Sequence, residues 1–325
     1  MKRNVLRTLI AGTAAAAMVL GSMGCFAEET EAVTETDAAE AEAVTETGAA
    51  ETEADAGEKE APKDQAILVV SFGTSYNDSR DLTIGAIEEA IAEAYPDYDV
   101  RRAFTSQIII DKLAERDGLD IDNVQKALDR AVEDGVKTLI VQPTHLMNGL
   151  EYTDVVEEVA QYADQFDAVA MGEPLLTSDA DYEAVIQAIT EATADYDDGE
   201  TAICFMGHGT EAESNSVYAA MQEKLTEAGY ENYFVGTVEA EPTLEDVLAA
   251  VGEGEYTKAV LAPLMIVAGD HANNDMAGDE EGSWKTEFTN AGYEVTCLVQ
   301  GLGELDGIQQ IFVEHTQAAI DSLSE

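Results

Sequence analysis

Short apolar runs alternate along the chain with longer stretches in which apolar residues recur at spacings of three and four. The short runs predict β-strands at Ala66–Ser71, Asp99–Ala103, Thr138–Gln142, Ala168–Met171, Ala202–Met206, Tyr233–Val238, Ala259–Ala262 and Glu294–Val299. The longer stretches predict helices such as Thr83–Ala94, Ile121–Asp134, Tyr152–Ala163, Ser216–Ala228 and Thr243–Val251. Apolar strands joined by helices are typical of parallel sheets covered on both faces. We therefore expect a doubly wound α/β fold, with functional loops after the strand C-termini.

The same strand–loop segments occur twice. ILVVSFGTS at Ile67–Ser75 returns as ICFMGHGTE at Ile203–Glu211, and KTLIVQPTHLMNGLE at Lys137–Glu151 returns as KAVLAPLMIVAGDH at Lys258–His271. A looser pair joins DYDVRRAFTS, which starts at Asp97, to ENYFVGTVEA, which starts at Glu231. This internal duplication predicts two similar α/β halves, residues 65–195 and 196–325, that face each other across a cleft.

The residues before 65 have a different composition. Lys2, Arg3 and Arg7 precede an Ala-rich apolar stretch that is too short to span a bilayer comfortably, which is typical of an export signal over residues 1–25. Cys25 after Ser22-Met23-Gly24 resembles a bacterial lipobox, although ordinary cleavage near Ala27 fits as well. Residues 26–64 are acidic, repetitive and poor in large apolar side chains, so we expect a disordered linker. The expected location is extracytoplasmic, with a lipid anchor at Cys25.

The charge of the chain excludes several kinds of partner. Lys and Arg total 16 against 67 Asp and Glu, which gives a net charge of −51. Nucleic acids and anionic membrane surfaces both require clustered basic residues, so neither is expected as a partner. The three cysteines are widely spaced, which excludes a disulfide-stapled scaffold and a CxxC zinc knuckle.

Three predicted strand-end loops of the second half carry metal-ligating side chains. These are His208 in MGHGT, Glu239 in TVEAEP and His271 in AGDHANND. Two imidazoles and one carboxylate on separate loops form a plausible open site for Co²⁺, Fe²⁺, Ni²⁺ or Zn²⁺. The first-half positions aligned with them are Phe72, Phe104 and Glu151, and the aromatic pair would suit a flat apolar ligand. The sequence lacks GxxxxGK[ST], GxSxG and HExxH motifs, which disfavours ATP-driven, serine-nucleophile and zincin chemistry.

Several segments together resemble the anaerobic-pathway sirohydrochlorin cobaltochelatases, which are ATP-independent class II chelatases related to ferrochelatase. They are AILVVSFGTSYND, RRAFTSQIIIDKLAERDG, PTHLMNGLEY, FMGHG, VGTVEAEP and PLMIVAGDHANNDMAGDEEGSWK, between about Ala66 and the C-terminus. The resemblance implies a tetrapyrrole cleft between the halves. It also implies a metal held by His208, Glu239 and His271, with His208 as proton acceptor. By the same resemblance, His145 and Glu151 assist metal delivery or proton removal.

Two features leave alternatives open. Sirohydrochlorin is a polycarboxylate, so an acidic protein needs local cations to bind it. Arg101 and Arg102 are the candidates, in the same basic segment as Arg80, Lys112 and Arg116; these residues could equally form a solvated surface. Export is the second feature, because tetrapyrrole synthesis is cytoplasmic. The alternative function is therefore an exported haem, tetrapyrrole or metal carrier with vestigial chelatase activity. The choice among Co²⁺, Fe²⁺ and Ni²⁺ stays open, as does homo-oligomer formation.

Overall fold

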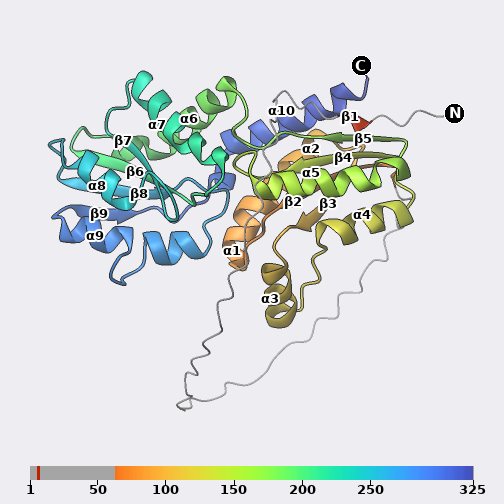
Figure 1. The fold of residues 1–325 in the computed structure, drawn as a ribbon, viewed down its shortest axis with the longest axis horizontal. Helices are drawn as coiled ribbons and strands as arrows, with labels where there is room; N and C mark the ends of the chain where they lie inside the picture. Colours follow the sequence, from red (N-terminus) through yellow and green to blue (C-terminus); the bar gives the residue numbers. More distant parts are fainter. Residues whose placement is uncertain (1–5, 8–62, 325) are drawn as a thin grey trace, which may run out of the picture. The chain divides into compact units, whose positions relative to one another are not determined.

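The computed structural model describes residues 6–7 and 63–324, which form two parallel β-sheets with helices around them (Figure 1). The nine strands of these residues are β1 (Leu6–Arg7), β2 (Gln65–Ser71), β3 (Asp99–Phe104), β4 (Thr138–Pro143), β5 (Ala168–Met171), β6 (Thr201–Gly207), β7 (Tyr233–Thr237), β8 (Lys258–Pro263) and β9 (Glu294–Cys297). All eight predicted strands are confirmed. The predicted signal peptide and linker lie outside the described residues, apart from β1, Lys63 and Asp64.

Helices of the described residues connect these strands. The α-helices are α1 (Asn77–Arg80), α2 (Ala86–Ala94), α3 (Gln107–Asp117), α4 (Val124–Glu133), α5 (Leu150–Tyr162), α6 (Asp179–Thr193), α7 (Ser216–Glu227), α8 (Leu244–Val251), α9 (Trp284–Asn290) and α10 (Asp306–Ser322). Two π-helical turns, η1 (Asp81–Gly85) and η5 (Ala272–Met276), interrupt this pattern. In this part of the chain no helix is both long enough and apolar enough to cross a membrane.

The two sheets repeat one topology, which confirms the duplication predicted from sequence. The first sheet has the order β1-β5-β4-β2-β3 and the second the order β7-β6-β8-β9. Read from the other edge, the second sheet is β9-β8-β6-β7, which is the first-sheet order without β1. The central strands are buried along their length because they are covered by helices on both faces.

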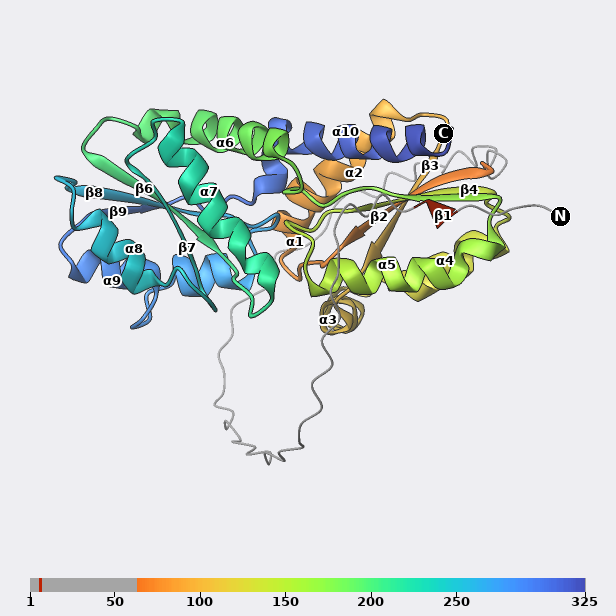
Figure 2. The same cartoon turned by 45° about the horizontal axis from the view of Figure 1, so that its top comes forward.

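Two helices exchange places between the halves, and this corrects the predicted boundary at 195/196. Helix α6 packs on the second sheet, where Thr193 hydrogen-bonds the hydroxyl of Tyr233 at 2.9 Å. Helix α10 returns to the first sheet, where Thr316 donates to Gln142 of β4 at 3.2 Å (Figure 2). One apolar core, which includes Ile67 and Ile203, consequently runs through both halves. Residues 63–324 form a single compact unit together with Leu6 and Arg7.

Candidate metal centre

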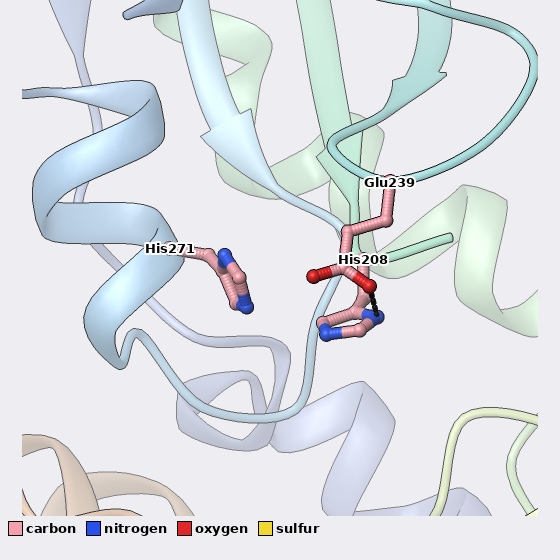
Figure 3. Close-up of side chains that lie close together, drawn as sticks. All are labelled: His208, Glu239 and His271. Carbon is pink, nitrogen blue, oxygen red and sulfur yellow. Dashed lines mark ion pairs between the residues drawn. The ribbon is translucent and has the colours of Figure 1, made fainter. Parts of the chain in front are cut away.

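His208, Glu239 and His271 converge in the structure (Figure 3). His208 directly follows β6, Glu239 lies two residues after β7, and His271 immediately precedes η5 in the connection that follows β8. One ligand atom from each side chain lies within 4.8 Å of the other two. The two imidazole rings are 4.7 Å apart between centroids and are nearly perpendicular, at 86°. Three strand-end loops thus deliver three metal-ligating groups to one place, as expected for a parallel sheet.

In both His208 and His271, a hydrogen bond occupies Nδ1 and leaves Nε2 available to bind another group. Nδ1 of His271 lies 2.8 Å from a carboxylate oxygen of Asp275, one turn further along the chain. Nδ1 of His208 lies 2.7 Å from the carbonyl oxygen of Gly209, which can only accept. Both Nδ1 atoms therefore donate, and each Nε2 keeps its lone pair for a metal ion or a proton. An outer carboxylate or carbonyl that orients a histidine in this way is typical of metal sites.

Glycines on each side of His208 fix its loop. A Cβ on Gly207 would lie 2.1 Å from the ring of Tyr218, and one on Gly209 would lie 2.8 Å from the backbone nitrogen of Ala240. Gly209 also has a φ of +87°, which L-residues rarely adopt. Its N–H donates to the Tyr218 hydroxyl at 3.3 Å. The MGHGT sequence therefore supplies the two small residues that this backbone path requires.

The loop that carries Glu239 is bonded to the His208 loop. The backbone N–H of Glu239 donates to the carbonyl of His208 at 2.9 Å, and that of Val238 donates to Gly207 at 3.0 Å. A carboxylate oxygen of Glu239 lies 4.0 Å from Nδ1 of His208. The side chains of Glu239 and His208 are 56% and 49% exposed, so this pair is open to solvent and to an incoming ligand.

The loop that carries His271 rests on the first half of the molecule. The N–H of Ala268 donates to the hydroxyl of Ser79 at 3.0 Å, and the hydroxyl of Tyr76 donates to Asp270 at 3.3 Å. These bonds couple the position of His271 to residues that follow β2. The second half therefore supplies all three metal-ligating side chains, and hydrogen bonds from the first half hold the loop that carries His271.

A small adjustment would let one ion bind all three groups. Metal–nitrogen and metal–oxygen bonds are about 2.0–2.2 Å long, so one ion can join donors up to about 4.3 Å apart. The three ligand atoms lie within 4.8 Å of one another, so any gap beyond that limit is at most about 0.5 Å. Because the side chains are partly exposed, rotation about their terminal bonds can close it. The three groups would then hold a divalent ion weakly, with coordination positions left open for another ligand.

Comparisons with known proteins agree with this geometry. The cobalt chelatase (CbiK) family model matches residues 65–321. A sirohydrochlorin cobaltochelatase of Salmonella typhimurium is 39% identical over 261 residues, which are 80% of this chain and 98% of that protein. The sirohydrochlorin cobaltochelatase CbiKC of Nitratidesulfovibrio vulgaris is 31% identical over 80% of this chain and 92% of that protein. The chain belongs to the cobalt chelatase family. This confirms the resemblance seen in the sequence, and with it the assignment to an enzyme family whose substrate metal is cobalt.

Solved structures confirm the chelatase fold. SirB from Bacillus subtilis with Fe³⁺ aligns with a TM-score of 0.59 at 14% identity, over 80% of this chain and 98% of that one. DR2241 from Deinococcus radiodurans, which is described as structurally similar to chelatases, aligns with a TM-score of 0.52 at 14% identity. That alignment covers 78% of this chain and 55% of DR2241. At such low identity the likeness concerns the fold alone.

Strand register corrects one of the aligned first-half positions. Ser71 pairs with Phe104, and the corresponding pair of the second sheet is Gly207 with Thr237. Phe104 is therefore equivalent to Thr237, and Ser106 is equivalent to Glu239. The backbone agrees, because the N–H of Ser106 donates to Phe72 as that of Glu239 donates to His208.

Phe104 consequently presents no exposed aromatic face to a ligand, although it lies in the lining of the pocket that Phe72 and Glu151 share. It is fully buried at the end of β3, in a cluster with Ile84 and Leu113. Phe72, by contrast, is 50% exposed in the position equivalent to His208. Glu151 lies in the first turn of α5 and is exposed. It keeps its predicted equivalence to His271, because β4 pairs with β2 in the same register in which β8 pairs with β6. Phe72 and Glu151 line one pocket of about 300 Å³.

Arg101 and Arg102 are committed to carboxylates of the protein itself. Both lie within β3, away from the strand-end loops. Arg101 is ion-paired with Asp99 and Asp134, each at 2.8 Å, and Arg102 forms two hydrogen bonds with Glu88. Their side chains are only 16% and 27% exposed. The prediction that these two arginines bind the substrate is therefore not supported: they neutralise charge within the first half.

His145 lies in the loop after β4, and both of its ring nitrogens are buried without a hydrogen-bond partner. Burial lowers the pKa of His145 to about 4 because the surroundings offer nothing to stabilise the charged form. An imidazole in that environment is a poor proton acceptor at neutral pH. The predicted role of His145 in proton removal does not fit its position in this structure.

The sequence interpretation missed Asp275 and Tyr218. Asp275 orients His271, and its signal was present as an acid four residues after the histidine in HANND. Tyr218 supports the backbone around His208 from α7, and no short motif marks it because the contact depends on how that helix packs.

Proposed function

We propose that this chain is a sirohydrochlorin cobaltochelatase that inserts Co²⁺ into sirohydrochlorin without ATP. The family and the curated relatives support the reaction and its substrates. The observation that carries the proposal is the convergence of His208, Glu239 and His271, whose ligand atoms lie within 4.8 Å of one another. Imidazole and carboxylate donors also suit Fe²⁺ and Ni²⁺, so the preference for cobalt rests on the relatives. The lack of a glycine-rich phosphate-binding motif supports independence from ATP.

The geometry explains how the reaction would proceed. Insertion requires the pyrrole N–H groups to lose their protons while the ion exchanges protein ligands for ring nitrogens. A weak and open three-ligand site can release the ion to the macrocycle, whereas a closed four-ligand site would retain it. Nε2 of His208 is free to bind the ion and, once the ion has moved on, to accept a proton. Glu239 lies beside that ring and would stabilise the imidazolium so formed.

The first experiment follows Co²⁺ insertion by absorbance without ATP, in the wild type and in His208→Ala. Loss of a ligand that is also the proton acceptor should lower kcat at least about 100-fold. Thermal unfolding controls for folding, because the side chain is half exposed and its loss should change the midpoint little. A variant that turns over at the wild-type rate would contradict the role of His208. If the wild type itself only binds tetrapyrrole tightly, with no turnover above the uncatalysed rate, the carrier function replaces the proposal.

We further propose that residues 1–25 direct export, that Cys25 carries a lipid anchor and that residues 26–64 form a spacer. The basic residues, the apolar stretch and the lipobox-like sequence support this view. The family match begins at residue 65, so this segment lies before the matched chelatase sequence. An exported chelatase would meet its tetrapyrrole and metal outside the cytoplasm.

A further inference from the structure

Nearly every basic side chain between residues 63 and 324 is already bound within the protein. Arg80, Arg101, Arg102, Arg116, Arg130, Lys137, Lys224, Lys258 and Lys285 each form an ion pair with a carboxylate, and Lys63 donates to two backbone carbonyls. Within this range, Lys112 and Lys126 are the two cations whose side chains have no such partner. An uncommitted cation is unusual in a chain with a net charge of −51.

Lys112 lines a pocket of about 590 Å³ that both halves of the molecule form. The first half contributes α3 and the residues after β2, while the second half contributes the loop near His271 and the segment after β9. Arg116, one turn further along α3, donates to the carbonyl of Ser75 and to the side chain of Asn77. It thereby holds the wall of the pocket in place and leaves Lys112 as its free positive charge.

The pocket also has an apolar part. Leu82 and Val299 line it from the two halves, and they are 57% and 41% exposed. Because these two side chains come from different halves and line one pocket, they give it an apolar surface against which a ligand could pack. Two acids, Asp78 and Glu304, also line the pocket. Glu304 accepts a hydrogen bond from the N–H of Gly301, and burial raises its pKa.

The pocket adjoins the metal centre through one loop. Ala268 and Asn273 line the pocket, and His271 lies between them in the sequence. Asn273 donates to the carbonyls of Ala268 and Gly269, which ties this loop into a compact turn. A large flat ligand whose centre lies next to His271 could therefore extend its edge into the pocket.

We propose that this pocket binds the edge of the tetrapyrrole, with Lys112 paired to a carboxylate of one of its acid arms and with Leu82 and Val299 against the macrocycle. This inference rests on the proposed function, because it assigns a binding role for the same substrate. It also answers the charge problem posed by an acidic protein and a polyanionic substrate: one positioned cation close to the site compensates for repulsion at long range. Lys112 takes the place of Arg101 and Arg102 in that role.

The test compares Lys112→Glu with Lys126→Glu in the full-length protein. The two substitutions change the net charge equally, and Lys126 is the other uncommitted lysine, on α4 and outside this pocket. Sirohydrochlorin binding is titrated directly in the absence of metal, and KM and kcat are measured with Co²⁺. We expect Lys112→Glu to raise the dissociation constant and KM at least about tenfold with little change in kcat, and Lys126→Glu to change them less than about twofold. High salt should reduce the difference.

Equal effects of the two variants would overturn the proposal, because the net charge alone would then explain them. A fall in kcat at unchanged affinity in Lys112→Glu would overturn it as well. The direct titration separates this inference from the proposed function. If the wild type binds sirohydrochlorin but does not metallate it, the chelatase assignment fails while the comparison of the two binding constants still decides the role of Lys112.

Discussion

His145 shows most clearly how a single environment changes the chemistry of a residue. Its ring nitrogens are enclosed and unpaired, so the neutral form is favoured and the pKa falls to about 4. In the unfolded chain the same side chain has a pKa near 6.5. Protonation therefore favours unfolding: the stabilising contribution is fully present above about pH 6.5 and is lost as the pH falls toward 4.

This difference predicts a measurable acid sensitivity. Between pH 7 and pH 4 the wild type should lose about 3 kcal/mol of unfolding free energy through His145 alone. His145→Leu removes the titrating group and should show a smaller loss over that interval. Urea unfolding of both proteins at several pH values measures the difference, in which the titration of the many carboxylates cancels. If the unfolding free energies of the two proteins fell in parallel with pH, His145 would accept a proton as easily in the folded protein as in the unfolded chain, and this prediction would be wrong.

At the scale of single residues, the sequence predicted which side chains could bind a metal better than it predicted the burial and the partners of each side chain. The three ligands could be found because each follows an apolar strand in a duplicated segment. Phe104 was wrongly aligned with Glu239 because it lies in the weakest of the three repeats, whose alignment is uncertain by about two positions. An error of two positions is enough to confuse the last residue of a strand with a residue of the following loop. Arg101 and Arg102 were misjudged because ion pairs with distant acids such as Glu88 depend on tertiary packing.

Elements were predicted well where the pattern was local. Apolar runs identified the eight strands from β2 to β9, but the helices named from the pattern did not include α1, α3, α6, α9 or α10. Helix α3 has Ile108 at 81% exposure, so its apolar positions do not mark one buried face. The end of β6 is the element on which the site depends most, because it places His208 against α7.

A pair of glycine substitutions tests this junction. Gly207→Ala would place a methyl group 2.1 Å from the Tyr218 ring, so α7 or β6 must shift, at a cost of about 1–3 kcal/mol in stability. Because Tyr218 also supports Gly209, chelation should fall as well. Gly85→Ala is the matched control: its φ is −59° and its nearest neighbour would be 3.6 Å away. It should be neutral or stabilise by up to about 1 kcal/mol, with normal activity. Thermal unfolding and Co²⁺ insertion are measured for both, and equal destabilisation would contradict the tight contact.

The molecule as a whole contains an exchange that the repeats do not predict. Internal similarity suggests two consecutive halves, yet α6 covers the second sheet and α10 covers the first. His315 of α10 reinforces the exchange, because its imidazole bonds the side chain of Asp181 in α6 and the backbone of Glu173. Such crossing packs both sheets into one core. Amphipathic periodicity shows that a helix is covered on one side, but it does not show which sheet covers it.

Location is the property of the whole chain that most affects its biological role, and the sequence before residue 65 makes a definite prediction. If Cys25 is lipidated after cleavage, the mature protein begins at that residue and fractionates with membranes, although the described part of the chain has no membrane-spanning helix. Cys25→Ser should abolish labelling by a radioactive fatty acid and leave an uncleaved or differently cleaved protein. Mass spectrometry of the mature N-terminus in both proteins measures this. A start near residue 28, with soluble protein outside the cytoplasm, would indicate ordinary signal cleavage. An intact N-terminus in the cytoplasm would contradict export and remove the conflict between this location and tetrapyrrole synthesis.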